Sequence, residues 1–245
     1  MAVIELLPAC FSSVWLIEWK ALDEFVNLID PHYEYTFLEK EKFHISVIQA
    51  TFHTIQMTSQ KWLDGRENIT GYDIMAYTWW RFMNDSDAPP HWLVQFPMVK
   101  ATVRAMDTVS DYVMKTYHKN ITQFTLTGIS MNAWITWLTA AVDSRVAAII
   151  PIGMDFLNFT KSFRHQHRAY CGWSYTWRSF YEMNMTQELD NPRFSVLVSQ
   201  VDPLAYNERY TNISKYVIIA SGDEFSMPDN SHYYFHQLEG KKFLL

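Results

Sequence analysis

The chain has 245 residues, of which 49% are hydrophobic, 16% aromatic and 19% charged. This composition excludes intrinsic disorder, because a chain so rich in Trp, Tyr and Phe buries enough apolar surface to offset the entropy lost on folding. With 20 Lys and Arg against 26 Asp and Glu, the net charge is −6, and no basic run exceeds two residues. We therefore expect no nucleic-acid partner.

Residues 1–20 form a mostly apolar segment with an Ala-Cys-Phe-Ser-Ser stretch at positions 9–13. We interpret it as a candidate signal segment, followed by a single domain over residues 21–245. Glu5 and Glu18 interrupt the segment and no Lys or Arg precedes it, so the alternative is a retained, buried helix. No other stretch approaches about 18 uncharged apolar residues, and the sequence therefore predicts no membrane span.

The first half of the domain contains three kinds of pattern. β-Branched and aromatic residues predict two short strands over Phe43–Ile48 and Thr51–Thr58. A very aromatic helix is expected over Tyr72–Met83, ending at a break rich in Asp and Pro. The clearest helix begins at Pro97 and continues to Tyr117, because its apolar residues recur every three or four positions.

Strands and helices alternate after residue 120. A strand over Gln123–Thr127 and a helix over Asn132–Val142 precede Val146–Ile152, a continuous apolar run typical of a strand buried on both faces. An irregular aromatic stretch over Phe163–Met185 lies in a cap region expected near 156–190. An apolar run, a buried strand, a helix and the beginning of a strand follow at Phe194–Val201, Tyr216–Ala220, His232–Leu238 and Phe243–Leu245. This alternation predicts an α/β fold, with a mostly parallel sheet and helices on both faces.

Glycosylation sequons and cysteines indicate the compartment. Six of the eleven asparagines stand in Asn-x-Ser/Thr, an excess over chance that favours a secreted glycoprotein modified at Asn68, Asn84, Asn120, Asn158, Asn184 and Asn212. Coincidence in a chain with many polar loops is the alternative. Cys10 and Cys171 are too few for a disulfide framework or a cysteine-rich zinc site. His165 and His167 lack a third ligand nearby, so we expect neither a metal nor a cofactor.

The segment Phe124–Ala133 reads as strand, turn and helix, the layout of a nucleophile elbow. Gly128 precedes the bend, and Ser130 would stand at its tip. There the dipole of the following helix and the N–H of Met131 would favour an oxyanion. The second glycine of the usual G-x-S-x-G pattern is replaced by Asn132. A serine that merely caps the N-terminus of a helix is therefore an equal alternative.

Asp223 follows the expected strand Tyr216–Ala220, where a triad acid would orient a histidine base. The alternative is that Asp223 or Asp229 caps the next helix, and Asp155 is the reserve candidate for the acid.

The histidine base is the missing part of this triad. In the order serine, acid, histidine the base should follow Asp223, and only His232 and His236 do so. Both fall in an expected helix, where packing or surface roles are more common than catalysis. His165 and His167 could face a cleft, but they precede the acid.

Several sequence blocks carry a family likeness. Gly128-Ile129-Ser130 followed by Trp134–Val146 resembles the PhoPQ-activated pathogenicity-related family, which includes the autocrine proliferation repressor proteins. The resemblance covers most of residues 21–245 through further blocks in the same order, at Leu22–Val26, Ala76–Trp79, Phe96–Ala101, Arg104–Val109, Asp202–Tyr206 and Gly222–Phe225 with Pro228-Asp229.

The resemblance implies a secreted protein with an α/β-hydrolase-like fold, in which Ser130 is the nucleophile position and Asp223 the acid position. The family typically places Lys-Arg-Gly after the elbow serine, whereas Met131, Asn132 and Ala133 stand here. Relatives also carry mid-sheet strands near the equivalent of Asn68 and a histidine loop after the last strand. We therefore expect this chain to lack mid-sheet strands and the C-terminal end of the fold.

These observations predict a secreted, α/β-hydrolase-like glycoprotein that is catalytically impaired. One alternative is an active serine hydrolase on an ester or amide, with Met131 in the oxyanion hole, acting on a small-molecule or peptide substrate. Another is an extracellular growth-repressing signalling protein with a cell-surface partner. A truncated or spliced chain that folds poorly is the third.

Overall fold

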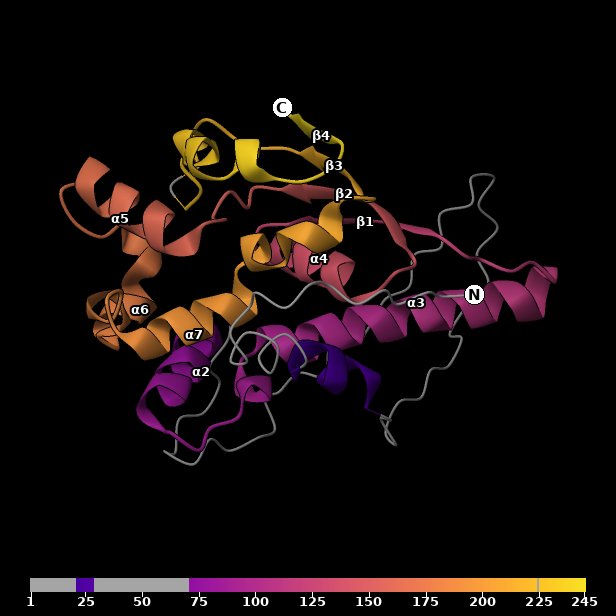
Figure 1. The fold of residues 1–245 in the computed structure, drawn as a ribbon, viewed down its shortest axis with the longest axis horizontal. Coiled ribbons are helices and arrows are strands. Elements are labelled where there is room, and N and C mark those ends of the chain that lie inside the picture. Colours follow the sequence, from indigo (N-terminus) through magenta and orange to yellow (C-terminus); the bar gives the residue numbers. More distant parts are fainter. Residues whose placement is uncertain (1–20, 29–70, 224) are drawn as a thin grey trace, which may run out of the picture.

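The computed structural model describes residues 21–28, 71–223 and 225–245 (Figure 1). The candidate signal segment, the expected strands Phe43–Ile48 and Thr51–Thr58, and Asn68 lie outside the described residues.

A four-stranded parallel sheet organises the described part of the chain (Figure 1). Its order follows the sequence, and every neighbouring pair is parallel. The strands are β1 (Phe124–Ile129), β2 (Val146–Ile152), β3 (Ser214–Val217) and β4 (Lys242–Leu244). The predicted α/β class with a parallel sheet is confirmed. The third strand begins before the expected Tyr216 and ends at Val217, with one further bridge between Ile218 and Ile152.

Six α-helices accompany the sheet in the described residues, besides a short α-helix over residues 21–27. They are α2 (Tyr72–Asn84), α3 (Gln95–Tyr117), α4 (Met131–Val142), α5 (Phe159–Ala169), α6 (Arg178–Glu182) and α7 (Pro192–Val201). Short 3-10 turns complete the description at η2 (Pro90–Trp92), η3 (Tyr175–Trp177), η4 (Met185–Gln187), η5 (Pro203–Tyr210), η6 (Pro228–Tyr233) and η7 (Phe235–Gln237). α3 begins two residues before Pro97, which the first turn of a helix tolerates.

Two expectations about helices were wrong. The stretch expected to be irregular contains α5, whose buried positions Phe159, Ser162, Phe163 and Gln166 recur at helical spacing. Two of these four are polar, so hydrophobic periodicity missed the helix. The helix expected over His232–Leu238 is instead the pair of turns η6 and η7, interrupted at Tyr234, whose φ is −139° and whose hydroxyl donates to Asp155.

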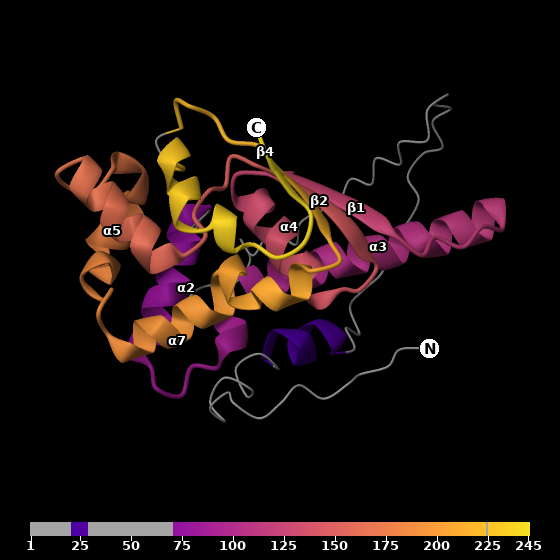
Figure 2. The same ribbon diagram turned by 45° about the horizontal axis from the view of Figure 1, so that its top comes forward.

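α4 packs against β1 and β2 and lies, with α3, on one side of the sheet (Figure 2). The approach of α4 to β1 needs a glycine, because a Cβ at Gly128 would lie 2.4 Å from the carbonyl oxygen of Asn132. Helices were expected on both faces. In the described residues, Thr125, Thr127 and Ile129 alternate toward the opposite face and are exposed, as is Tyr216 of β3.

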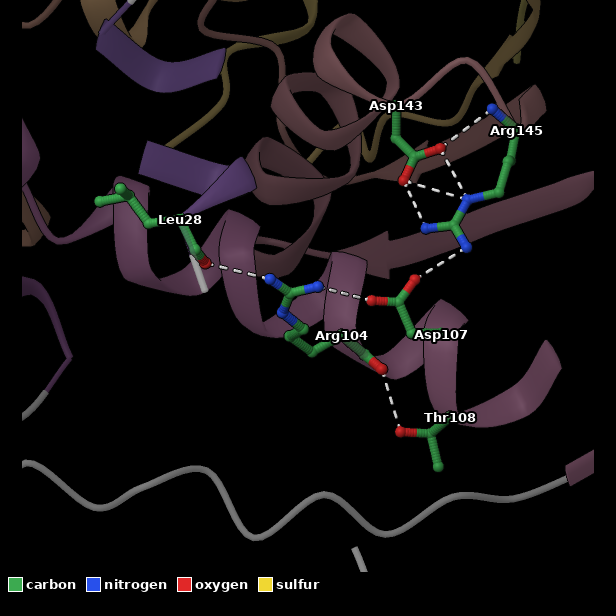
Figure 3. A network of polar contacts seen from close by, with 6 residues as sticks. All are labelled: Leu28, Arg104, Asp107, Thr108, Asp143 and Arg145. Carbon is green, nitrogen blue, oxygen red and sulfur yellow. Dashed lines mark hydrogen bonds and ion pairs between the residues drawn. The ribbon is translucent and has the colours of Figure 1, made fainter. Parts of the chain in front are cut away.

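An ion-pair network fastens α3 to the turn between α4 and β2 (Figure 3). The guanidinium of Arg145 contacts Asp143 at 2.7 Å and Asp107 at 2.9 Å. Arg104 pairs with Asp107 at 2.8 Å and donates to the carbonyl of Leu28 at 3.1 Å. Partial burial raises the pKa of Asp143, but the hydrogen bonds from Arg145 outweigh burial, so the net pKa is lowered.

Aromatic side chains fill the space between α2 and the region near 156–190. Trp79 of α2 contacts Phe159 and Phe180, and Trp177 contacts Phe163 and Phe180. All five side chains are buried. This cluster sets α2, α5 and α6 beside the carboxyl ends of the strands (Figure 1).

Candidate active site

Ser130 stands between the end of β1 and the start of α4, at φ 56° and ψ −123°. Residues other than glycine rarely adopt these backbone angles, and holding one in this conformation costs about 1–3 kcal/mol. The N–H of Ser130 donates to the carbonyl of Ile152 at 2.8 Å, which ties the bend to β2. The predicted strand–turn–helix bend at Ser130 is therefore present, with the serine at its tip.

The alternative, a serine that serves only as a helix cap, makes a specific geometric demand. A capping Oγ accepts a hydrogen bond from an N–H in the first turn. Ser130 makes no such side-chain bond. Its Oγ instead lies 3.1 Å from the hydroxyl of Tyr72. The hydroxyl therefore contacts Tyr72 and does not cap the N-terminus of α4.

Tyr72 is the residue that the sequence did not predict for this site. It is the first residue of α2 and follows Gly71, whose φ is 59°. Its ring stacks on Phe225, with centroids 4.6 Å apart, and meets Trp177 edge-on at 6.3 Å. Burial raises the pKa of Tyr72; the hydrogen bond with Ser130 lowers it and the charge of Asp223 raises it further, for a net increase. The phenol is therefore neutral near pH 7 and serves as a hydrogen-bonding partner rather than a strong base.

Asp223 lies in the turn after β3, close enough for its charge to act on Tyr72. Its Oδ1 accepts the backbone N–H groups of Phe225 at 2.8 Å and Ser226 at 2.9 Å. The carboxylate thus orders the loop that carries Phe225 over the site. The sequence allows Asp223 either to orient a base or to cap the following segment. The bonds present are of the second kind, made to a loop instead of a helix.

The four histidines considered as the base do not contact Ser130. His165 Nε2 is 2.7 Å from Asp229 Oδ2, and His167 packs against Trp173. His232 and His236 are exposed in η6 and η7. Within the described ranges, the recorded hydrogen-bond partner of Ser130 Oγ is a tyrosine, and none of these histidines takes that place.

Asp155, the reserve acid, is fully buried beneath the same loop. Burial raises its pKa to about 8, although a hydrogen bond from the Tyr234 hydroxyl opposes the shift. Its backbone N–H donates to Ser226 Oγ at 3.2 Å. Asp155 is therefore mostly neutral at pH 7 and supports the loop, whereas Asp223 is the carboxylate whose charge acts on Tyr72.

A small cavity adjoins Ser130. Its walls are mostly aromatic or apolar, including Tyr72, Met131, Phe156, Trp177 and Phe225. The space open to the centre of a water molecule is about 20 Å³, which is room for about one water. Met131 opens α4, so its N–H has no partner within the helix. An oxyanion at this point would be favoured, but the cavity beside Ser130 is too small for an acyl group while Tyr72 is in place.

Neither a metal site nor a membrane span is found in the described part of the chain. No group of three or more His, Cys, Asp or Glu side chains comes together there in a way that could hold a metal ion. No described helix is both long and apolar enough to cross a bilayer.

The chain is similar to known proteins in sequence and in structure. The model of the PhoPQ-activated pathogenicity-related family matches residues 64–245. Autocrine proliferation repressor protein A of Dictyostelium discoideum is 37% identical over 166 residues, which are 68% of this chain and 33% of that protein. The chain thus spans about a third of the length of this relative. Acetyl xylan esterase 1 of Thermoanaerobacterium sp. matches with a TM-score of 0.44 and 12% identity, over 73% of this chain and 51% of the esterase. From the family match, the chain belongs to the PhoPQ-activated pathogenicity-related family.

Proposed function

We propose that this chain is a secreted glycoprotein on an α/β-hydrolase-like scaffold that acts by binding, as an extracellular repressor of growth, and that its catalysis is impaired. One observation carries the proposal: the hydroxyl of Ser130 is paired with the neutral phenol of Tyr72 at 3.1 Å, where a hydrolase needs a histidine base. With no histidine base at Ser130 among the described residues, only residual oxyanion-hole and binding effects are expected, and several orders of magnitude in rate are lost.

The growth-repressing role rests on likeness. The Dictyostelium relative is named an autocrine proliferation repressor. The region matched by the family model, residues 64–245, includes the elbow and the turn after β3. The described sequons support secretion in part. Asn84, Asn120, Asn184 and Asn212 are exposed, as a glycan acceptor must be. Asn158 is half-buried, and its amide nitrogen donates to the carbonyl of Tyr233 at 3.0 Å.

A growth assay tests the binding role. Purified protein added to responding cells should slow proliferation, and Ser130→Ala should act equally well because no acyl transfer is needed. Loss of the response in Ser130→Ala, with the fold intact by circular dichroism, would contradict the proposal. Enzymatic deglycosylation with mass spectrometry should find glycans at the four exposed sites and none at Asn158.

An active serine hydrolase is the second candidate, because the strained backbone of Ser130 is retained. A fluorophosphonate probe separates the two. We expect no labelling of Ser130 in the folded protein at pH 7, with an active serine hydrolase as the positive control. Labelling that disappears in Ser130→Ala would establish the second candidate in place of the first.

A further inference from the structure

Tyr72 is held at the site as a bound ligand would be held. One face of its ring stacks on Phe225 with an interplanar angle of 21°, and Trp177 approaches edge-on at 66°. Its polar end meets the Ser130 hydroxyl. A flat aromatic surface, an aromatic edge and one hydrogen-bonding group together form a slot for a ring that bears a single polar substituent.

The attachment of Tyr72 allows the ring to leave this slot. The side chain is only partly buried and belongs to the first residue of α2. Gly71 precedes it at positive φ, with no atom within 4 Å of where a Cβ would stand. The anchors of α2 in the core are Met75, Trp79 and Phe82, further along the helix. The first residue can therefore change its backbone angles while these three stay packed.

The charge near the slot selects among aromatic ligands. Asp223 lies beside the cavity, since its Oδ2 is 3.5 Å from where a Cβ on the cavity-lining Gly153 would stand. Its charge also opposes ionisation of the Tyr72 phenol. The same carboxylate would repel an anionic substituent held at this position, such as a benzoate. A neutral phenol or aryl ester avoids that repulsion and still exchanges a hydrogen bond with Ser130.

We propose that the slot occupied by Tyr72 is a binding site for a neutral aromatic ring with one hydrogen-bonding group, and that Tyr72 is its built-in competitor. The proposal rests on the proposed function only in that a ring at this site is held by Ser130 and is not hydrolysed there; the growth response is not assigned to this site. The residual cavity of about 20 Å³ is too small for such a ring while Tyr72 is in place. Ligand binding and displacement of Tyr72 are therefore coupled.

Calorimetric titration with 4-methylphenol tests this inference on three forms of the full chain. Tyr72→Phe keeps the ring but removes the bond to Ser130, worth about 1 kcal/mol, so affinity should rise about fivefold over the unmodified chain. Tyr72→Ala empties the slot and should raise affinity by more than about tenfold. The anion 4-methylbenzoate should bind at least tenfold more weakly than 4-methylphenol to Tyr72→Ala at pH 7.

Two controls distinguish a ligand site from an artificial hole. Adding Ser130→Ala to Tyr72→Ala should weaken 4-methylphenol binding about fivefold and leave toluene binding unchanged. Tyr77→Ala removes an equally large buried side chain from the same helix, and any binding it creates should not depend on Ser130. Equal affinity in the unmodified chain and both Tyr72 variants, or no effect of Ser130→Ala, would overturn the inference. Probe labelling and the growth assay do not enter these readouts, so failure here is separate from failure of the proposed function.

Discussion

The backbone of Ser130 makes glycine a better replacement for this serine than alanine. Both substitutions remove the hydroxyl and its bond to Tyr72, so their difference isolates the main chain. At φ 56° and ψ −123° a residue with a Cβ is strained by about 1–3 kcal/mol. Glycine has a more disordered unfolded state, which costs about 0.5–1 kcal/mol relative to alanine. We therefore expect Ser130→Gly to be more stable than Ser130→Ala by about 1 kcal/mol, within limits of about 0 and 2.5 kcal/mol.

Urea denaturation of the two variants measures this difference. Ser195 is the control, since it is exposed within α7. There the order should reverse, with glycine less stable than alanine by about 1 kcal/mol. A Ser130→Ala variant more stable than Ser130→Gly would refute the elbow geometry.

Two further predictions concern groups around the site and the sheet. Asp155 has a folded pKa of about 8 against an ordinary value of 3.8, so its contribution to stability is fully present below pH 4 and is lost as pH rises through 8. Asp155→Asn should flatten the dependence of unfolding free energy on pH by up to about 1.4 kcal/mol per pH unit, measured by denaturant titration from pH 5 to 8. An unchanged slope would contradict burial of an ionisable carboxyl there. Arg145→Met leaves the partly buried Asp143 unpaired and should cost about 1–3 kcal/mol in thermal unfolding. Arg178→Met, which breaks an exposed pair with Glu182, should change nothing measurable; similar losses in both would argue against the network.

The sequence predicted those elements whose local chemistry agrees with their place in the fold. Gly128 and Ser130 predict the elbow because the turn demands a residue without a Cβ close to α4. In the same way, the regular spacing of apolar residues predicts α3, and the continuous apolar run predicts β2 as a buried strand. The sequence did not predict α5 because Ser162 and Gln166 occupy half of its buried positions. There side-chain hydrogen bonds, to the carbonyls of Leu157 and Phe225, take the place of hydrophobic contacts.

The blocks that carried the family resemblance are largely structural in this fold. Arg104 and Asp107 come from one block and Asp143 and Arg145 from another, and the four meet in one ion-pair network (Figure 3). Asp202, from a third block, holds the start of α5 by accepting the N–H of Phe159 at 2.8 Å. The pairs Asp107–Arg145 and Phe159–Asp202 join residues far apart in the sequence, so their spacing along the chain does not reveal the contact.

Tyr72 could not have been predicted as a site residue. In sequence it is one aromatic residue among many at the start of an aromatic helix. Its role depends on Phe225, Trp177 and Ser130, which come from three other parts of the chain. No local sequence pattern around Tyr72 indicates these three contacts.

A double-mutant cycle on the contact between Tyr72 and Ser130 tests the central claim most directly. The unfolding free energies of Tyr72→Phe, Ser130→Ala and the double variant give the coupling between the two hydroxyls. Their 3.1 Å separation predicts a coupling of about 0.5–1.5 kcal/mol. Pairing Tyr72→Phe with Ser226→Ala, another residue of the cavity wall, should give almost none. A coupling near zero between Tyr72 and Ser130 would contradict the account, because the serine would then be free for another partner.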